Sequence, residues 1–346
     1  MAGRRILLYD IRRAAGARRR HRETVDYFQL DDRSFYERYR FDKQSVDYLV
    51  EEFCGGLESR TNHYPASAKT KMLVTLRYLA SNALQEVIGD TFCISKGGVN
   101  NIIWEVIPRI AERMDDFIKM PTGQALLDTN RDFHRMTGIP GIVGCIDCTH
   151  IKVNVGEDQK ASFLNRKGFT SNNVQAVCDA SYRFISVYAF WPGCTHDSFI
   201  LKHSALFKDF EQKRREGILL GDSGYGSGKP WMLTPFGNPE TPAQRRYNYA
   251  QKRGRVLIEQ SFGQVKRRFR GLLDGFRTSP ERANIATVAA MVLHNIAKER
   301  GQPDNFDDAQ PGDLEMEEEC TLPATAGAEF PEGRRFRDHI VETFFV

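Results

Sequence analysis

The sequence predicts a mixed α/β (α+β) protein in which an all-helical region precedes a domain of strands and helices. Apolar residues follow helical spacing as far as about residue 115,. Short apolar runs typical of strands begin at residue 142,. A polar stretch at 121–140 lies between the two patterns and predicts the domain boundary,. The length of 346 residues and the hydrophobic fraction of 41% suit a chain with two domains and a real core,.

The first region contains a helical stretch at 32–57 and then three helices, predicted at 69–80, 83–91 and 96–107,. Ser95 is a suitable N-cap for the third helix,. A short second helix, a tight turn and a third helix are typical of a helix-turn-helix. In that motif Lys96, Asn100 and Asn101 would face DNA bases and phosphates,. A plain helical bundle that touches no DNA has the same pattern, so both interpretations stay open.

The second region contains strands and helices in an order that identifies a known layout. Strands are predicted at 142–153, 174–178, 184–191 and 217–221, and helices at 196–210, 255–272 and 284–298,. The segment 224–250 is expected to be irregular. The order is three antiparallel-compatible strands, a helix, a fourth strand and a helix, which is the layout of a ribonuclease-H-like domain.

Four acidic residues fall at positions that this layout brings to one side of the sheet. Asp147 lies in the middle of the first strand, Asp222 follows the fourth strand, and Glu259 lies in the first turn of the next helix. Asp197 begins the helix after the third strand. Carboxylates this close are either partly protonated or surround a cation, and their oxygens favour Mg²⁺ or Mn²⁺. Two such ions would support phosphodiester cleavage. Each acid by itself is also a common cap or turn residue, and the inference depends on their joint placement.

A zinc site is the rival interpretation. Cys145 and Cys148 form a C-x-x-C pair, and His150, Cys194 and His196 follow,. On a strand, however, residues three apart point to opposite faces, so the two thiols cannot easily bind one ion. The seven cysteines in this long chain form no regular framework and are interpreted as reduced thiols of an intracellular protein,.

Charge is unevenly distributed along the chain. Residues 1–22 hold eight arginines, 252–270 are basic, and 303–320 are acidic. The basic clusters predict contacts with nucleic acid, although an exposed solvated face gives the same pattern. The candidates for holding DNA phosphates are Arg166, Lys167, Lys266, Arg267, Arg268 and Arg270,. His294 and Asn295 lie in an apolar helix and are expected to pack or to form local hydrogen bonds,.

The resulting domain organisation has four parts and includes no membrane segment. These are a basic arm (1–30), a helical region (31–136) with the helix-turn-helix at 67–115, the nuclease domain (137–300) and an acidic, partly disordered C-terminal segment (301–346),. No apolar run reaches the length of a membrane span,.

Nine short motifs over about 142–296 resemble those of the PIF/Harbinger transposases and the Harbinger transposase-derived nucleases. They include Gly144-Cys-Ile-Asp147-Cys-Thr-His-Ile151, Asn165-Arg-Lys-Gly168, Trp191-Pro-Gly-Cys-Thr-His-Asp197, Leu220-Gly-Asp222-Ser-Gly-Tyr225, Ile258-Glu259-Gln-Ser-Phe-Gly263 and Val292-Leu-His-Asn295. The resemblance implies that Asp147, Asp222 and Glu259 are the D-D-E metal ligands and that Asp197 is a fourth ligand or a support. It also implies DNA cleavage at terminal inverted repeats, followed by attack of the freed 3′-hydroxyl on target DNA.

The same resemblance implies a separate Myb/SANT-like partner protein, a nuclear location and a homo-oligomer on DNA. A domesticated DNA-binding or scaffold protein that no longer cuts is the alternative. The complete set of acidic residues favours the enzyme, because a protein without catalytic function would be free to lose them.

Overall fold

The computed structural model describes residues 27–57, 66–226, 228–304 and 331–346. The arginine-rich arm and nearly all of the acidic stretch lie outside these residues. The chain divides into two compact units, Met1–Ile107 and Pro108–Val346. None of the described helices combines the length and the hydrophobicity that crossing a bilayer demands.

The first unit consists of helices. They are η1 (Tyr27–Gln29), α2 (Asp32–Tyr39), α3 (Lys43–Cys54), α4 (Ala68–Ser81), α5 (Gln85–Phe92) and α6 (Lys96–Glu112), the last of which continues past the unit boundary. The N-termini of α2, α3 and α4 are capped by the side chains of Asp31, Asp42 and Ser67,. The expected stretch 32–57 is broken into two helices at Arg40, which adopts the left-handed conformation with φ 65°.

The turn between α5 and α6 is tight. Cys93 takes a left-handed conformation with φ 55°, and the Ile94 N–H donates to the Gly89 carbonyl over 2.9 Å. A Cβ on Gly89 would lie 2.4 Å from the Ile94 carbonyl oxygen, so this close approach requires glycine,. Ser95 Oγ accepts a hydrogen bond from the Gly98 N–H, which confirms its predicted capping role,. The three helices lie where the sequence places them.

The second unit contains a five-stranded mixed sheet with the order β3-β2-β1-β4-β5. The strands are β1 (Ile142–Lys152), β2 (Ser171–Cys178), β3 (Phe184–Pro192), β4 (Ile218–Leu220) and β5 (Met232–Leu233). β2 is antiparallel to both β1 and β3, whereas β4 is parallel to β1. This arrangement confirms the predicted ribonuclease-H-like α/β fold. The two-residue strand β5 is too short to be recognised from sequence.

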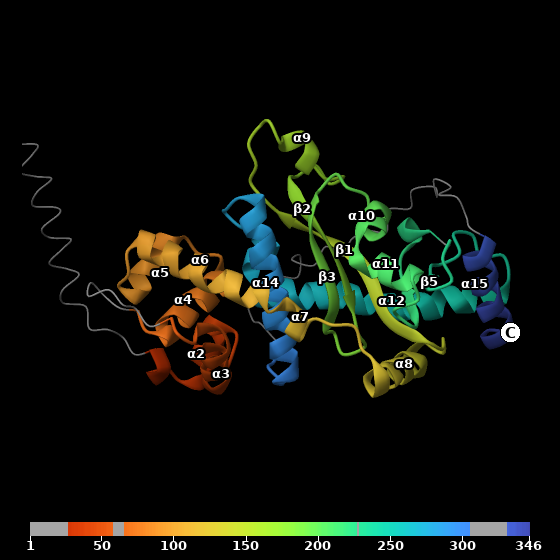
Figure 1. The fold of residues 1–346 in the computed structure, drawn as a ribbon, viewed down its shortest axis with the longest axis horizontal. Coiled ribbons are helices and arrows are strands. Elements are labelled where there is room, and N and C mark those ends of the chain that lie inside the picture. Colours follow the sequence, from red (N-terminus) through yellow and green to blue (C-terminus); the bar gives the residue numbers. More distant parts are fainter. Residues whose placement is uncertain (1–26, 58–65, 227, 305–330) are drawn as a thin grey trace, which may run out of the picture. The chain divides into compact units, whose positions relative to one another are not determined.

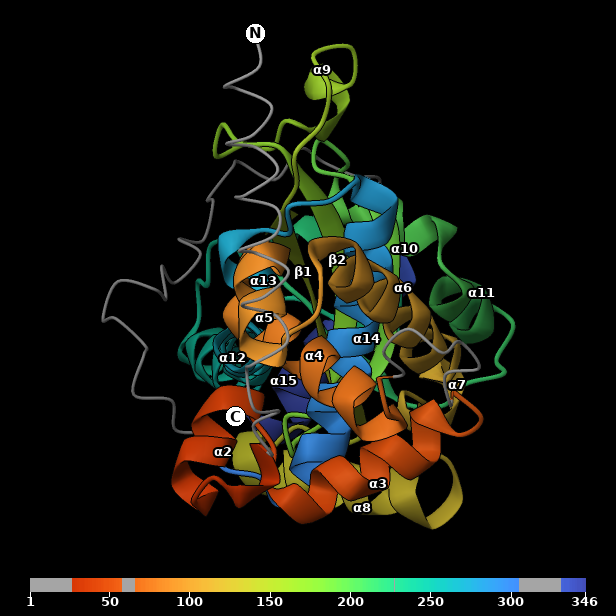
Figure 2. The same ribbon diagram turned by 90° about the vertical axis from the view of Figure 1, so that its left-hand side faces the viewer.

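Helices cover both faces of this sheet. α12 (Pro242–Arg268) runs across the strands (Figure 1), and α13 (Arg270–Asp274) and α14 (Pro280–Glu299) follow it. α10 (Asp197–His203) and α11 (Ala205–Glu211) lie on the side of β1 and β2 opposite to α12 (Figure 2). The remaining elements are α7 (Met114–Phe117), α8 (Gly123–Thr137), α9 (Lys160–Phe163), η2 (Ser223–Tyr225) and α15 (Pro331–Phe344).

The polar stretch 121–140 contains α8, whose narrow apolar face centres on the buried Phe133. Two expectations about this unit were wrong. The segment 224–250 is not irregular throughout, because a capping box at Thr241 starts α12 at Pro242,. The helix expected at 196–210 is two helices separated by Ser204, which ends one and caps the next.

The C-terminal helix α15 packs against the nuclease domain. Arg337 lies over the Phe236 ring, 3.9 Å from its centroid, and donates to the Pro235 carbonyl. Ile340 and Val341 are buried. The second unit therefore extends beyond residue 300. The sequence did not predict this, because an acidic stretch precedes α15.

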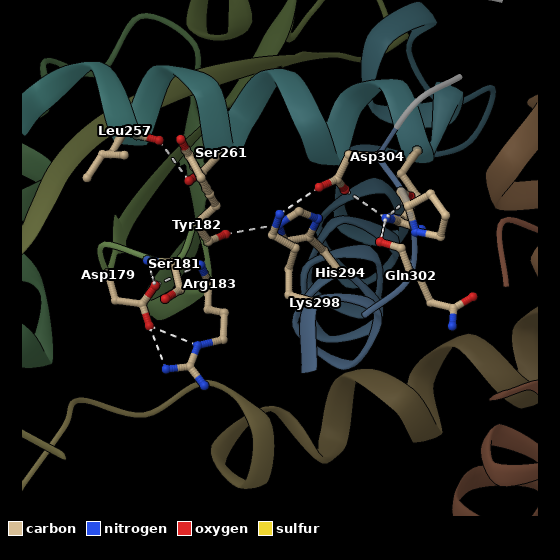
Figure 3. Close-up of polar contacts among 12 residues, drawn as sticks. Asp179, Ser181, Tyr182, Arg183, Leu257, Ser261, His294, Lys298, Gln302 and Asp304 are labelled. Atoms are coloured by element: carbon tan, nitrogen blue, oxygen red, sulfur yellow. Dashed lines mark hydrogen bonds and ion pairs between the residues drawn. The ribbon is translucent and has the colours of Figure 1, made fainter. Parts of the chain in front are cut away.

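A buried polar cluster joins the end of α14 to the sheet and to α12 (Figure 3). His294 Nε2 lies 3.0 Å from the Tyr182 carbonyl oxygen, and burial lowers the pKa of His294 to about 3, with the Arg268 charge adding to the shift,. Asp304 receives hydrogen bonds from Lys298 and Arg268. The side chain of Asn295 bonds both the N–H and the carbonyl of Phe184. The predicted packing role of His294 and Asn295 is confirmed.

Candidate active site

Strand β1 presents Asp147 to helix α12. The same face carries Cys145, whose thiol donates to the Gly254 carbonyl over 3.1 Å, and Thr149, whose hydroxyl accepts from Lys266 over 2.6 Å. Residues alternate between the two faces of a strand, so these three side chains share one face. Close approach of α12 to the sheet requires glycine at 254, because a Cβ there would lie 2.5 Å from a Leu220 methyl.

Arg255 joins two of the predicted ligands. Its guanidinium lies 3.8 Å from Asp147 Oδ2 and 3.2 Å from Glu259 Oε1. The Arg255 and Asp147 side chains are 8% and 13% exposed, while Glu259 is 36% exposed. Sequence reasoning missed Arg255, although its i,i+4 spacing from Glu259 places both on one face of α12. A positive charge thus lies between the first and third acids of the triad.

The other two acids lie beside this pair. Asp222 caps η2 by accepting the Gly224 N–H over 3.0 Å. Asp197 Oδ1 accepts from the Asn173 side-chain amide over 3.0 Å. Burial and then the negative charge of Asp197 raise the pKa of Asp222, and Arg255 opposes them,. The charge of Arg255 therefore acts on Asp222 as well as on Asp147 and Glu259, while Asp197 acts on Asp222.

The donor set fits a hard divalent cation, but its present geometry is not that of a finished ion site. Among the residues that the structure describes, no group of three or more His, Cys, Asp or Glu side chains is positioned to hold an ion. Carboxylate oxygens are the ligands that Mg²⁺ and Mn²⁺ prefer. Asp147, Asp222 and Glu259 could supply them once Glu259 exchanges its contact with Arg255 for the ion.

Cys145 and Cys148 do not converge on a common zinc site. Cys145 faces α12, whereas Cys148 Sγ lies 3.4 Å from the Tyr225 hydroxyl in the opposite layer. Burial raises the pKa of both thiols well above its usual range, which keeps them protonated,. The six cysteines in the described part of the chain are free. The expected separation of Cys145 from Cys148 across the strand is confirmed.

Three further basic side chains lie near His150 on β1. Lys266 contacts Thr149 and the His150 carbonyl. Burial lowers the pKa of His150 to about 4; Asp197 opposes this shift, while Lys266, Lys167 and Arg166 reinforce it. All four of these residues are therefore close enough to influence one imidazole. Arg166 and Lys167 are exposed in the loop before β2, whose shape is fixed by bonds from the Lys167 and Phe169 N–H groups to Asn165 Oδ1.

The remaining basic candidates on α12 and α13 differ from this group. Arg268 is fully buried and donates to the Pro303 carbonyl and to Asp304. Its side chain has no surface left for a DNA phosphate, so Arg268 is withdrawn as a DNA-contacting candidate. Arg270 pairs with Asp274 at 3.4 Å, and Arg267 is half-buried.

In the first unit, the candidates of the helix-turn-helix lie at the start of α6. Lys96 and Asn101 are exposed, and Asn100 is half-buried. The Asn100 side-chain oxygen accepts from Gln85 on α5 over 3.4 Å. These three residues lie far along the chain from the carboxylates and belong to the other unit.

Comparison with known proteins connects this geometry to a family. Residues 146–295 match the model of the DDE superfamily endonuclease family. The chain is 36% identical over 293 residues to "Putative nuclease HARBI1" of Bos taurus, covering 82% of this chain and 83% of the relative. The Homo sapiens protein of the same name is 35% identical over 293 residues, with the same coverage of both chains. "Protein ALP1-like" of Arabidopsis thaliana is 28% identical over 291 residues, or 77% of this chain and 71% of the relative.

No solved structure matches the chain. The family match spans Asp147, Asp197, Asp222 and Glu259, and the similarity to the animal relatives extends well beyond it. The chain therefore belongs to the Harbinger transposase-derived nucleases of the DDE endonuclease superfamily.

Proposed function

We propose that this protein is a divalent-metal-dependent DNA endonuclease whose catalytic ligands are Asp147, Asp222 and Glu259, with Asp197 as a fourth ligand or support. The observation that carries the proposal is the pairing of Asp147 on β1 with Glu259 on α12 through Arg255. The charges of Asp197 and Arg255 both act on Asp222. Carboxylates from separate elements are what a metal-dependent phosphodiesterase needs.

The residues around the carboxylates have separate roles in this proposal. Two bound Mg²⁺ or Mn²⁺ ions would supply stabilisation of the charge that develops on the phosphodiester oxygens. Lys266, Arg166 and Lys167 bind phosphates on the side where they surround His150,. His150 stays neutral near pH 7, since its pKa is about 4. Asn173 holds Asp197 in place through its amide.

The proposal extends from cleavage to strand transfer. The enzyme would cut at terminal inverted repeats and join the freed 3′-hydroxyl to target DNA as a homo-oligomer in the nucleus. The exposed Lys96 and Asn101 at the start of α6 would contact DNA together with Asn100, and a Myb/SANT-like partner would complete recognition. Arg267 and Arg270 would add phosphate contacts along α12 and α13.

Plasmid nicking tests the cleavage step. The wild type is incubated with supercoiled DNA and Mg²⁺ or Mn²⁺, beside Asp147→Asn, Asp222→Asn and Glu259→Gln. Each of these variants should lose nicking by at least about 1,000-fold while it still binds DNA, because a missing ligand removes transition-state stabilisation. Glu216→Gln is the matched control, since Glu216 is an exposed acid before β4. Nicking by the three variants at the wild-type rate would refute the assignment.

A DNA-binding or scaffold protein without nuclease activity is the second candidate. It is favoured by Arg255, which already neutralises part of the charge of Asp147 and Glu259, and by the lack of a preformed ion site among the described residues. Under this proposal the wild type binds DNA but never nicks it in Mg²⁺ or Mn²⁺. An oligonucleotide strand-transfer assay, with and without the partner protein, then separates transposase from simple endonuclease.

A further inference from the structure

Five aromatic rings form a continuous surface on strand β3 and helix α10. Tyr188 contacts Phe190 and Trp191 with ring centroids 6.1 and 6.3 Å apart. Trp191 contacts Phe199 at 5.4 Å and His203 at 5.8 Å, and the last two rings are 4.0 Å apart. Phe190 is 67% exposed and Phe199 is 45% exposed. We call these five residues the aromatic face.

Large exposed aromatic side chains need an explanation here. Soluble proteins expose single apolar residues routinely, but contiguous groups mark binding sites. β3 is the last strand of the sheet in the order β3-β2-β1-β4-β5. The aromatic face therefore lies at the border of the sheet, and folding of this unit leaves two of its rings largely in water.

The aromatic face lies next to Asp197, one of the four candidate acids. Trp191 is the sheet partner of Asn173, whose amide donates to Asp197. Asp197 is the first residue of α10, and Phe199 follows two residues later. A single helical turn thus separates an acid of the candidate active site from the exposed rings.

A cation lies beside the rings. Lys202 is exposed on the same helix, and no described carboxylate forms an ion pair with it. Proteins hold unpaired nucleotides with aromatic rings that stack on the bases and with cations that bind the phosphates.

We propose that the aromatic face is a subsite for unpaired bases of DNA, adjacent to the phosphodiester that the carboxylates address. The proposal rests on the proposed nuclease function for its substrate class. It adds that the strand next to the cleaved bond is held unpaired, with one or two bases stacked on Phe199, Trp191 or Phe190. Blunt duplex DNA, whose bases are all stacked on each other, cannot use these rings.

Binding of fluorescent oligonucleotides tests the subsite. The probes are a blunt duplex and the same duplex with a three-nucleotide overhang that carries 2-aminopurine, both in EDTA so that no cleavage occurs. The wild type should bind the overhang probe about tenfold more tightly than the blunt probe and should quench the 2-aminopurine emission, because stacking on an aromatic ring both stabilises the base and quenches it.

Matched variants locate the effect. Phe190→Ala/Phe199→Ala should abolish the preference for the overhang, and Phe199→Leu should reduce it although apolar area remains. Leu127→Ala is the control, since Leu127 is 56% exposed on α8, and it should keep the full preference. Both phenylalanines are exposed, so these variants should fold, which circular dichroism verifies.

Two results would overturn the proposal. One is equal affinity of the wild type for both probes; the other is an overhang preference that survives Phe190→Ala/Phe199→Ala. Either would show that the aromatic face does not hold unpaired bases. The nuclease proposal has a separate readout: a protein that nicks plasmid but ignores the overhang refutes the subsite alone. A protein that stacks the overhang but never nicks refutes the nuclease alone.

Discussion

Arg255 offers the sharpest test of the candidate active site. Its guanidinium lies 3.8 Å from Asp147 and 3.2 Å from Glu259. At an effective dielectric constant of about 20, two unit charges 4 Å apart attract by about 4 kcal/mol. Desolvation of the buried guanidinium offsets much of this in the wild type, but removing one partner of a buried pair costs about 3–5 kcal/mol.

The expected loss is near the lower end of that range. Glu259 is 36% exposed, so water screens its attraction to Arg255, which contributes about 1 kcal/mol or less to stability,. Asp147 is 13% exposed and loses its cation in Arg255→Ala. We therefore expect Arg255→Ala to lower the free energy of unfolding by about 3 kcal/mol at pH 7. Urea unfolding followed by circular dichroism measures this change.

Two comparisons make the result specific. Arg253→Ala, which removes an exposed arginine from the same helix, should change the free energy of unfolding by less than about 0.5 kcal/mol. Mg²⁺ should stabilise Arg255→Ala more than the wild type, because the ion then replaces the missing positive charge. If Arg255→Ala is no less stable than Arg253→Ala, or if it shows no coupling with Glu259→Gln in a double-mutant cycle, the electrostatic argument fails.

Three further predictions concern the surrounding structure. Gly254→Val should lower the free energy of unfolding by about 1–3 kcal/mol in urea titrations, because even a Cβ at 254 would lie too close to its neighbours,. Gly97→Ala, at a position with open space around it, should leave the free energy of unfolding unchanged or raise it. An equal loss of stability in both variants would contradict the packing argument. Because the pKa of His294 is lowered from 6.5 to about 3, stability should fall as pH drops below about 6.5, where only the unfolded chain takes up the proton, by up to about 1.4 kcal/mol per pH unit. His294→Asn should lose this part of the pH dependence. If the free energy of unfolding changes equally with pH in both proteins between pH 6.5 and 5, the role of His294 is refuted. Arg268→Met should lower the free energy of unfolding by about 3 kcal/mol, since it leaves the half-buried Asp304 carboxylate with one cation fewer,. The DNA affinity per folded molecule should nevertheless match that of the wild type in a salt titration. A reduced salt dependence of binding would show that Arg268 contacts a phosphate after all.

The fold could be predicted where local patterns were strong. Helical spacing located α4, α5 and α6, and the apolar run of β1 placed Asp147 in mid-strand. The prediction failed where local composition and tertiary packing disagree. α8 is mostly exposed, and its polar sequence resembles that of a linker because only one narrow face of the helix is buried. α15 follows an acidic stretch, and only its packing against the nuclease domain reveals its place in the fold.

The acidic cluster could be anticipated, but its partners could not. Asp147, Asp222 and Glu259 stood out because the predicted layout brings them together and because Asp147 lies in an apolar run, where a carboxylate needs an explanation. Nothing in the sequence singles out Arg255 from the other basic residues of 252–270. Likewise, the sequence does not distinguish Arg268 from Arg267 and Arg270, although Arg268 is fully buried and the other two are half-buried.

The sequence by itself determined the family and the order of the main helices and strands, and it singled out the four acids as candidates, because these depend on residue type and spacing along the chain. Tertiary structure decided which cation faces which acid, since that depends on how closely α12 lies against the sheet at Gly254, where a side chain would meet Leu220. It also decided that five aromatic residues from 188–203 form one surface beside Asp197. Charge and hydrophobicity belong to each residue type, whereas contacts between residues far apart in the sequence exist only in the folded chain.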